Sequence, residues 1–194
     1  MDDSLQSRII RAARLDPALY DEVKADPRSL PQATFVVVLS ALATGIGFGQ
    51  GELGPIALGM LFALFGWWFA AYLAYFIGAK LMPEPRIELG LETGDRTDAT
   101  PGDLLRTIGF SNSPGIVRML AVVPEIQIFV MLATTVWMIF ASVIAIRQGL
   151  AYHSTARAAG VYLAIQLLLV PLVLLFATGE PPGPVNGSGV PGAP

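Results

Sequence analysis

Cysteine is absent from this chain of 194 residues, and histidine occurs once, as His153. The absence of cysteine excludes disulfides, thiolate metal sites and cysteine nucleophiles, and a single imidazole cannot form a multi-histidine metal centre. Charged residues are also scarce: they make up 14% of the sequence, whereas 54% of it is hydrophobic. This balance is too apolar for an ordinary soluble domain, so the composition predicts a membrane protein and gives no indication of a metal or cofactor.

Long uncharged stretches predict an all-α fold, a membrane bundle of five transmembrane helices. A helix needs about 20 apolar residues to cross a bilayer core. The predicted spans cover 33–49, 56–78, 108–123, 126–146 and 158–178. They define a transmembrane domain over 31–178. The last residues, 179–194, are rich in Gly and Pro without periodicity and predict a flexible tail.

The N-terminal segment, 1–30, predicts an amphipathic helical region ahead of the first span. Within 5–15, apolar residues fall on one side of a helix and arginines on the other. The apolar side has Leu5, Ile9, Ala12 and Ala13, and the basic side has Arg8, Arg11 and Arg14. Such a helix is typical of the surface of an anionic membrane. A small helix packed on the rest of the chain explains the pattern equally well.

Two helix starts are indicated by their capping residues. Asp16 followed by Pro17 supplies a capping carboxylate and a proline suited to the first helical position. Thr100, Pro101 and Asp103 form a similar start, with an acid at the third position. We therefore expect short helices to begin at both places.

The third span is the apolar segment least like a regular transmembrane helix. It contains Ser111, Asn112, Ser113, Pro114, Gly115 and Arg118. Because Pro114 lacks a backbone donor, carbonyls near Phe110 need partners from hydroxyl or amide side chains, water or other helices. The segment is therefore predicted to be a broken helix sheltered by its neighbours. Its candidate polar site consists of Ser111, Asn112, Pro114 and Arg118.

Arg118 allows a structural and a functional interpretation. It lies roughly 9 Å along a helix from Pro124, within reach of the nearer membrane surface. Glu125 and Glu52 are the expected ion-pair partners in the turns on that side. The functional alternative is that an intramembrane arginine marks a substrate or ion path.

Small residues recur at helical spacing in the first two spans and predict close helix packing. The candidate packing positions are Gly47, Gly51, Gly59, Ala63, Gly66 and Ala70. Small side chains let helix backbones approach one another in lipid. The second-span stripe predicts a tight helix pair, within the chain or with another membrane protein.

The distribution of Lys and Arg predicts the orientation. With five spans, every loop on one side of the membrane contains basic residues, while 50–55, 124–125 and the tail contain none. Basic loops stay in the cytoplasm. The N-terminus is therefore expected in the cytoplasm and the C-terminus outside, in an inner (cytoplasmic) cell membrane.

Three stretches make the chain resemble the prokaryotic branch of the Yip family, the Ypt/Rab-interacting-protein domain of five-span membrane proteins. They are RAARLDPALYDEVKADP, GFSNSPGIVRML and VWMIFASVIAIRQGLAYHSTARAAGV. The resemblance implies a cytoplasmic N-terminus, five helices and no known enzymatic chemistry. A Rab partner, which eukaryotic members have, is not carried over to this chain.

The residues give catalysis and nucleic-acid binding little support. There is no GxSxG motif, no acid pair within a span, and no basic patch with interleaved aromatics. The leading hypothesis is a non-enzymatic scaffold or accessory subunit that contacts lipid and binds other integral membrane proteins or itself. The alternative is a small transporter or channel that uses Asn112 and Arg118. A wet cavity reaching both residues would distinguish the alternative from the scaffold.

Overall fold

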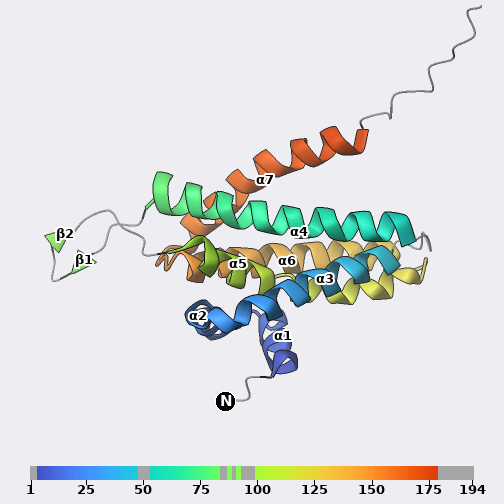
Figure 1. The fold of residues 1–194 in the computed structure, drawn as a ribbon, viewed down its shortest axis with the longest axis horizontal. Coiled ribbons are helices and arrows are strands. Elements are labelled where there is room, and N and C mark those ends of the chain that lie inside the picture. The colour runs from blue at the N-terminus through green and yellow to red at the C-terminus, as the bar shows by residue number, and fades with distance from the viewer. Residues whose placement is uncertain (1–3, 48–52, 84–86, 89–90, 93–98, 179–194) are drawn as a thin grey trace, which may run out of the picture.

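The computed structural model describes residues 4–47, 53–83, 87–88, 91–92 and 99–178 (Figure 1). It confirms the all-α class. The elements are α1 (Leu5–Ala13), α2 (Pro17–Ala25), η1 (Pro27–Ser29), α3 (Leu30–Gly47), α4 (Leu53–Tyr75), η2 (Phe76–Leu81), β1 (Ile87–Glu88), β2 (Leu91–Glu92), α5 (Pro101–Phe110), η3 (Ser113–Val122), α6 (Gln127–Gly149) and α7 (Thr155–Thr178). The two short strands pair antiparallel within the region expected to be a loop. The predicted tail lies outside the described residues.

Within the described part of the chain, three helices are long and apolar enough to cross a membrane: Pro27–Gly47, Ile56–Leu81 and Gln127–Gly149. A shorter apolar helix covers Thr155–Pro171. The chain is therefore a multi-pass membrane protein. The second of these helices ends in a π-helical turn, η2, which carries it beyond the predicted end of the second span.

The third predicted span, 108–123, contains the last residues of α5 and all of η3, and α5 extends the helical segment back to Pro101. α5 is a regular helix, and η3 is a ten-residue 3-10 helix that follows the break at 111–112. At 1.5 Å per residue for α5 and 2.0 Å for η3, the two pieces together extend about 35 Å. That length suffices for a bilayer core of about 30 Å. Because a 3-10 helix rises more per residue than an α-helix, η3 covers more length than an α-helix with the same number of residues would.

α3 packs parallel to α5 and η3 through small residues spaced seven apart. A side chain added at Gly109 would lie 2.7 Å from the Cβ of Ala33, and one at Gly115 would collide with Ser40. One at Gly47 would collide with a backbone carbonyl of η3. Ala33, Ser40 and Gly47 therefore form one close-contact stripe, as small residues do in lipid.

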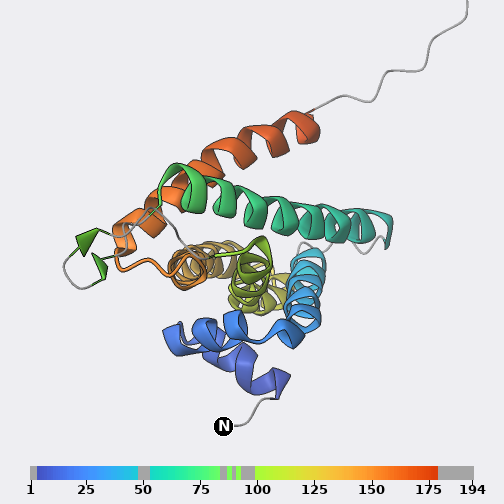
Figure 2. The same cartoon turned by 60° about the vertical axis from the view of Figure 1, so that its left-hand side comes forward.

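The elements form three layers in Figure 2, with α4 and α7 uppermost, α3, α5–η3 and α6 in the middle, and α1 and α2 below. The upper layer packs on the middle one near the start of α7, around the buried side chains of Leu104, Ile146, Leu150 and Val161. Beyond Gln166 the described α7 side chains are largely exposed. The second half of α7 accordingly leans away from the bundle in both views.

Both predicted helix starts are confirmed. The Asp16 carboxylate accepts a hydrogen bond from the Ala18 amide at 3.0 Å. At the start of α5, the Thr100 hydroxyl accepts from the Asp103 amide at 3.2 Å, and the Asp103 carboxylate accepts from the Thr100 amide at 2.8 Å. This reciprocal pair satisfies two amides that a helix leaves without partners.

Candidate functional site

The break between α5 and η3 is held by its own side chains. The hydroxyl of Ser111 donates to the carbonyl of Ile108 at 2.8 Å, and the amide of Asn112 donates to the same carbonyl at 2.9 Å. The hydroxyl of Ser113 donates to the carbonyl of Phe110 at 2.7 Å. The expectation that carbonyls near the break take side-chain partners is confirmed. Backbone polar groups within a membrane must be satisfied in this way.

Arg118 contacts hydroxyl groups of α6. Its Nε donates to Thr134 at 3.2 Å and its Nη2 donates to Thr135 at 3.0 Å. Within the described residues it forms no ion pair, and Glu125 is exposed in the turn before α6. The predicted ion pair with Glu125 is therefore wrong, because Arg118 turns toward the threonines. Glu52 lies outside the described residues.

A cavity of about 690 Å³ lies between the middle and upper layers, and α3, α4, α5, η3, α6 and α7 all line it. Its polar lining includes Ser111, Asn112, Arg118, Thr135, Ser142 and Gln166. Pro114, the fourth residue of the predicted polar site, is instead buried and does not line the cavity. The cavity thus unites three of the four predicted polar residues.

The predicted second-span packing stripe faces this cavity. Gly59, Ala63, Gly66 and Ala70 all line it. A side chain added at Gly59 or Gly66 would meet no atom within 4 Å. Within the described chain the stripe therefore does not form the tight helix pair predicted for it, since no helix approaches these glycines. Gly47 does make a close contact, with η3, and Gly51 lies outside the described residues.

The sequence missed one cavity residue, Thr135, but contained a signal for another, Trp67. Thr135 contacts Arg118, and its only signal was a pair of adjacent threonines in an otherwise apolar span. Trp67 also lines the cavity and donates its indole N–H to the Leu105 carbonyl at 3.0 Å. Its central position in the second span, away from the interface where tryptophans gather, was the available signal.

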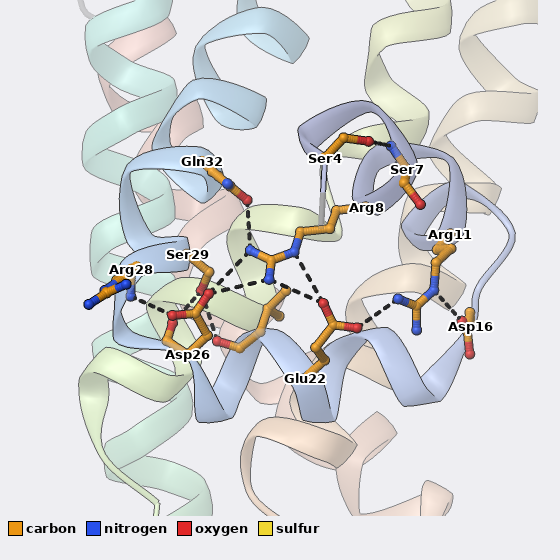
Figure 3. A network of polar contacts seen from close by, with 11 residues as sticks. Ser4, Ser7, Arg8, Arg11, Asp16, Glu22, Asp26, Arg28, Ser29 and Gln32 are labelled. Atoms are coloured by element: carbon orange, nitrogen blue, oxygen red, sulfur yellow. Dashed lines mark hydrogen bonds and ion pairs between the residues drawn. The ribbon is translucent and has the colours of Figure 1, made fainter. Parts of the chain in front are cut away.

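The N-terminal helices carry a second polar cluster (Figure 3). Arg8, which is only 5% exposed, donates to Glu22 at 3.2 Å, to Asp26 at 3.3 Å and to Gln32 at 2.9 Å. The guanidinium therefore joins α1, α2 and the start of α3. An arginine so enclosed must be paired to offset its lost hydration.

Arg11 extends this cluster. It donates to Glu22 at 2.7 Å and to Asp16 at 2.8 Å. Glu22 first and Asp16 second raise the pKa of Arg11 above its usual value. Arg8 and Arg11 therefore face acids of this chain, whereas Arg14 is exposed. Of the two interpretations of α1, this geometry favours a helix packed on the rest of the chain.

The fold and its polar interior define a polytopic α-helical membrane protein with a cavity among its apolar helices. The model of the Yip1 domain matches residues 15–177, so the chain belongs to the Yip1 domain family. Comparisons with curated proteins and with solved structures found no significant match.

Proposed function

We propose that this chain is a non-enzymatic scaffold that binds other integral membrane proteins, or a second copy of itself, through α4. The observation that supports this proposal is the low burial of α4 within the chain. In the most apolar 18-residue window of this helix 6% of the residues are buried, against 33% in the corresponding window of α3 and 22% in that of α6. The small-residue stripe of α4 is open for a partner helix, and small residues permit the closest helix contacts in lipid. An accessory role in a larger membrane complex is one form of this function.

The proposal includes five crossings and a defined orientation. The starts of α3, α5 and α7 and the ends of η2 and α6 gather at one end of the bundle in Figure 1. Arg28, Lys80, Arg106, Arg147 and Arg157 lie near these points. By the distribution of basic residues, this end is cytoplasmic, the membrane is an inner cell membrane, and the C-terminal tail is external.

The test is purification in mild detergent followed by identification of copurifying chains and measurement of the oligomeric state. Gly59→Leu and Gly66→Leu together add bulk where the chain itself has space, so the fold is retained while a docked helix is expelled. Leu61→Ala, on the exposed side of α4, is the matched control. A strictly monomeric protein without partners contradicts the proposal, and so does binding that survives both leucines.

The cavity favours a second candidate, a small transporter or channel. It reaches both Asn112 and Arg118, as a solute pathway past the broken segment requires. Solute uptake into vesicles containing the protein, compared with vesicles containing Arg118→Gln, is the test. Equal uptake by the two would contradict a pathway past Arg118.

A further inference from the structure

We propose that the cavity binds an anionic lipid, with its carboxylate or phosphate group on Arg118 and its alkyl chain along α6. This goes beyond the scaffold function. It concerns the cavity of the second candidate, but it does not require that anything cross the bilayer.

Among the residues that the structure describes, the cavity contains a positive charge without a counter-ion. Arg118 is the one charged residue among those that line it, and its partners in the described residues are two neutral hydroxyls. A guanidinium has five N–H donors, so three remain after these contacts. Charge within a membrane is costly unless it is paired or hydrated. An oxyanion fits the remaining donors, because carboxylates and phosphates accept two parallel hydrogen bonds from arginine.

The other polar groups near the break are already occupied. The amide of Asn112 donates to backbone carbonyls, and the hydroxyls of Ser111 and Ser142 lie 3.3 Å apart. Arg118 is therefore the dominant site for an anion. η3 ends four residues beyond Arg118, so at 2.0 Å per residue the backbone of Arg118 lies about 8 Å inside the end of that helix. A lipid headgroup needs such a shallow position.

The rest of the cavity suits an alkyl chain. Along α6 it extends from Thr135 to Ile146, a length of about 16 Å at 1.5 Å per residue. Much of the wall on this path is aliphatic, with Met138, Ile139 and Ile165. Its volume falls in the range of about 300–1,000 Å³ that is usual for ligand sites.

The cavity also has a route from the bilayer. Thr135 and Ile139 line it and are exposed, as is Gly59 on the opposite wall. The second half of α7 leans away from the bundle (Figure 2), and its described side chains are largely exposed. A lipid can therefore enter sideways without passing through water.

The experiment uses Trp67 as a reporter, because it lines the cavity. Trp68→Phe and Trp137→Phe leave it as the single tryptophan in the full-length protein, whose helicity is checked by circular dichroism. The probe is dibromostearate with mid-chain bromines, added to detergent-solubilised protein. We expect saturable quenching, with half-saturation at a concentration about tenfold or more higher in Arg118→Gln, because a charged hydrogen-bonding partner is lost. Arg118→Lys should restore part of the affinity, and Arg14→Gln should have no effect.

Two further measurements use only the single-tryptophan protein with Arg118 intact, so their outcome does not depend on whether an Arg118 variant folds. The uncharged methyl ester of dibromostearate should quench with at least tenfold weaker half-saturation, and inorganic phosphate should not displace dibromostearate. Equal binding of acid and ester, displacement by inorganic phosphate, or unchanged binding in a folded Arg118→Gln protein would each overturn the proposal. Because copurification is scored separately, the scaffold function can fail while Trp67 quenching remains.

Discussion

Arg8→Met should release α1 from the bundle while the transmembrane helices remain folded. Methionine keeps the apolar stem but removes the charge and every donor of the guanidinium. The acids that it contacts would then lie beside an apolar side chain. Losing one partner of a buried ion pair costs about 3–5 kcal/mol.

The expected cost here is smaller because water reaches the two acids. Their side chains are 26% exposed at Glu22 and 32% exposed at Asp26, and Glu22 keeps its contact with Arg11 at 2.7 Å. We therefore expect about 2 kcal/mol, less than the loss of one partner of a fully buried pair. Since 1.4 kcal/mol is a factor of ten, amide exchange in α1 should become about 30-fold faster.

Hydrogen exchange measured by mass spectrometry on the full-length protein in detergent reports this change by segment. Peptides from α1 should exchange faster in Arg8→Met, whereas peptides from α3 should match the parent. Arg14→Met is the matched control, because Arg14 is exposed and has no role in the cluster. Unchanged α1 exchange in Arg8→Met, or an equal acceleration in Arg14→Met, would refute the idea that the buried guanidinium holds α1 in place.

Three other predictions use the same protein. Gly47→Ala should lower the thermal unfolding midpoint, because the added methyl overpacks the contact with η3 at a cost of about 1–3 kcal/mol. Gly59→Ala should be neutral or stabilise the protein by up to about 1 kcal/mol, because Gly59 lies in a helix beside open space. Equal midpoints for the two variants would contradict this. The hydroxyl of Tyr20 is buried without a hydrogen-bond partner among the described residues, so Tyr20→Phe should not destabilise α2 at pH 7. Burial also raises the pKa of the Tyr20 phenol above 10.0, so the neutral phenol is favoured in the folded state. The contribution of this group to the free energy of unfolding is therefore complete below pH 10 and is lost as the pH rises further. Hydrogen exchange in α2 should accelerate at alkaline pH, and Tyr20→Phe should reduce that acceleration. Tyr152→Phe removes hydrogen bonds of 2.8 and 2.6 Å to two carbonyls at the end of η2 and should accelerate exchange there, by about 1–3 kcal/mol of lost protection.

The elements predictable from the sequence were those governed by local chemistry. The capping carboxylate of Asp16 and the Thr100–Asp103 pair act within one helical turn, so their residue types alone indicate the helix starts. The need of the carbonyls near Phe110 for side-chain partners also follows from Pro114 alone. Helix membership in the apolar spans follows from length and composition, because lipid admits few other backbone structures.

Contacts between distant segments were less predictable. Arg118 reaches equally well toward Glu125 or toward α6, and the choice depends on how η3 rotates its side chains about the helix axis. A 3-10 helix turns by three residues instead of 3.6, so faces assigned for an α-helix shift along the segment. Glu125 follows Arg118 by seven residues, a spacing that would place both on one face of an α-helix. The switch to 3-10 geometry removes that alignment.

The two small-residue stripes show why packing was only half predictable. The stripe on α3 and the one on α4 have similar composition and spacing, yet α3 meets η3 closely while Gly59 and Gly66 face open space. Gly109 and Gly115 account for the difference, because the absence of a side chain at these positions lets the backbone of the broken third segment approach α3 closely. Gly59 and Gly66 instead border the cavity, which Arg118 also lines. α4 still contacts α5 through the hydrogen bond from Trp67 to Leu105.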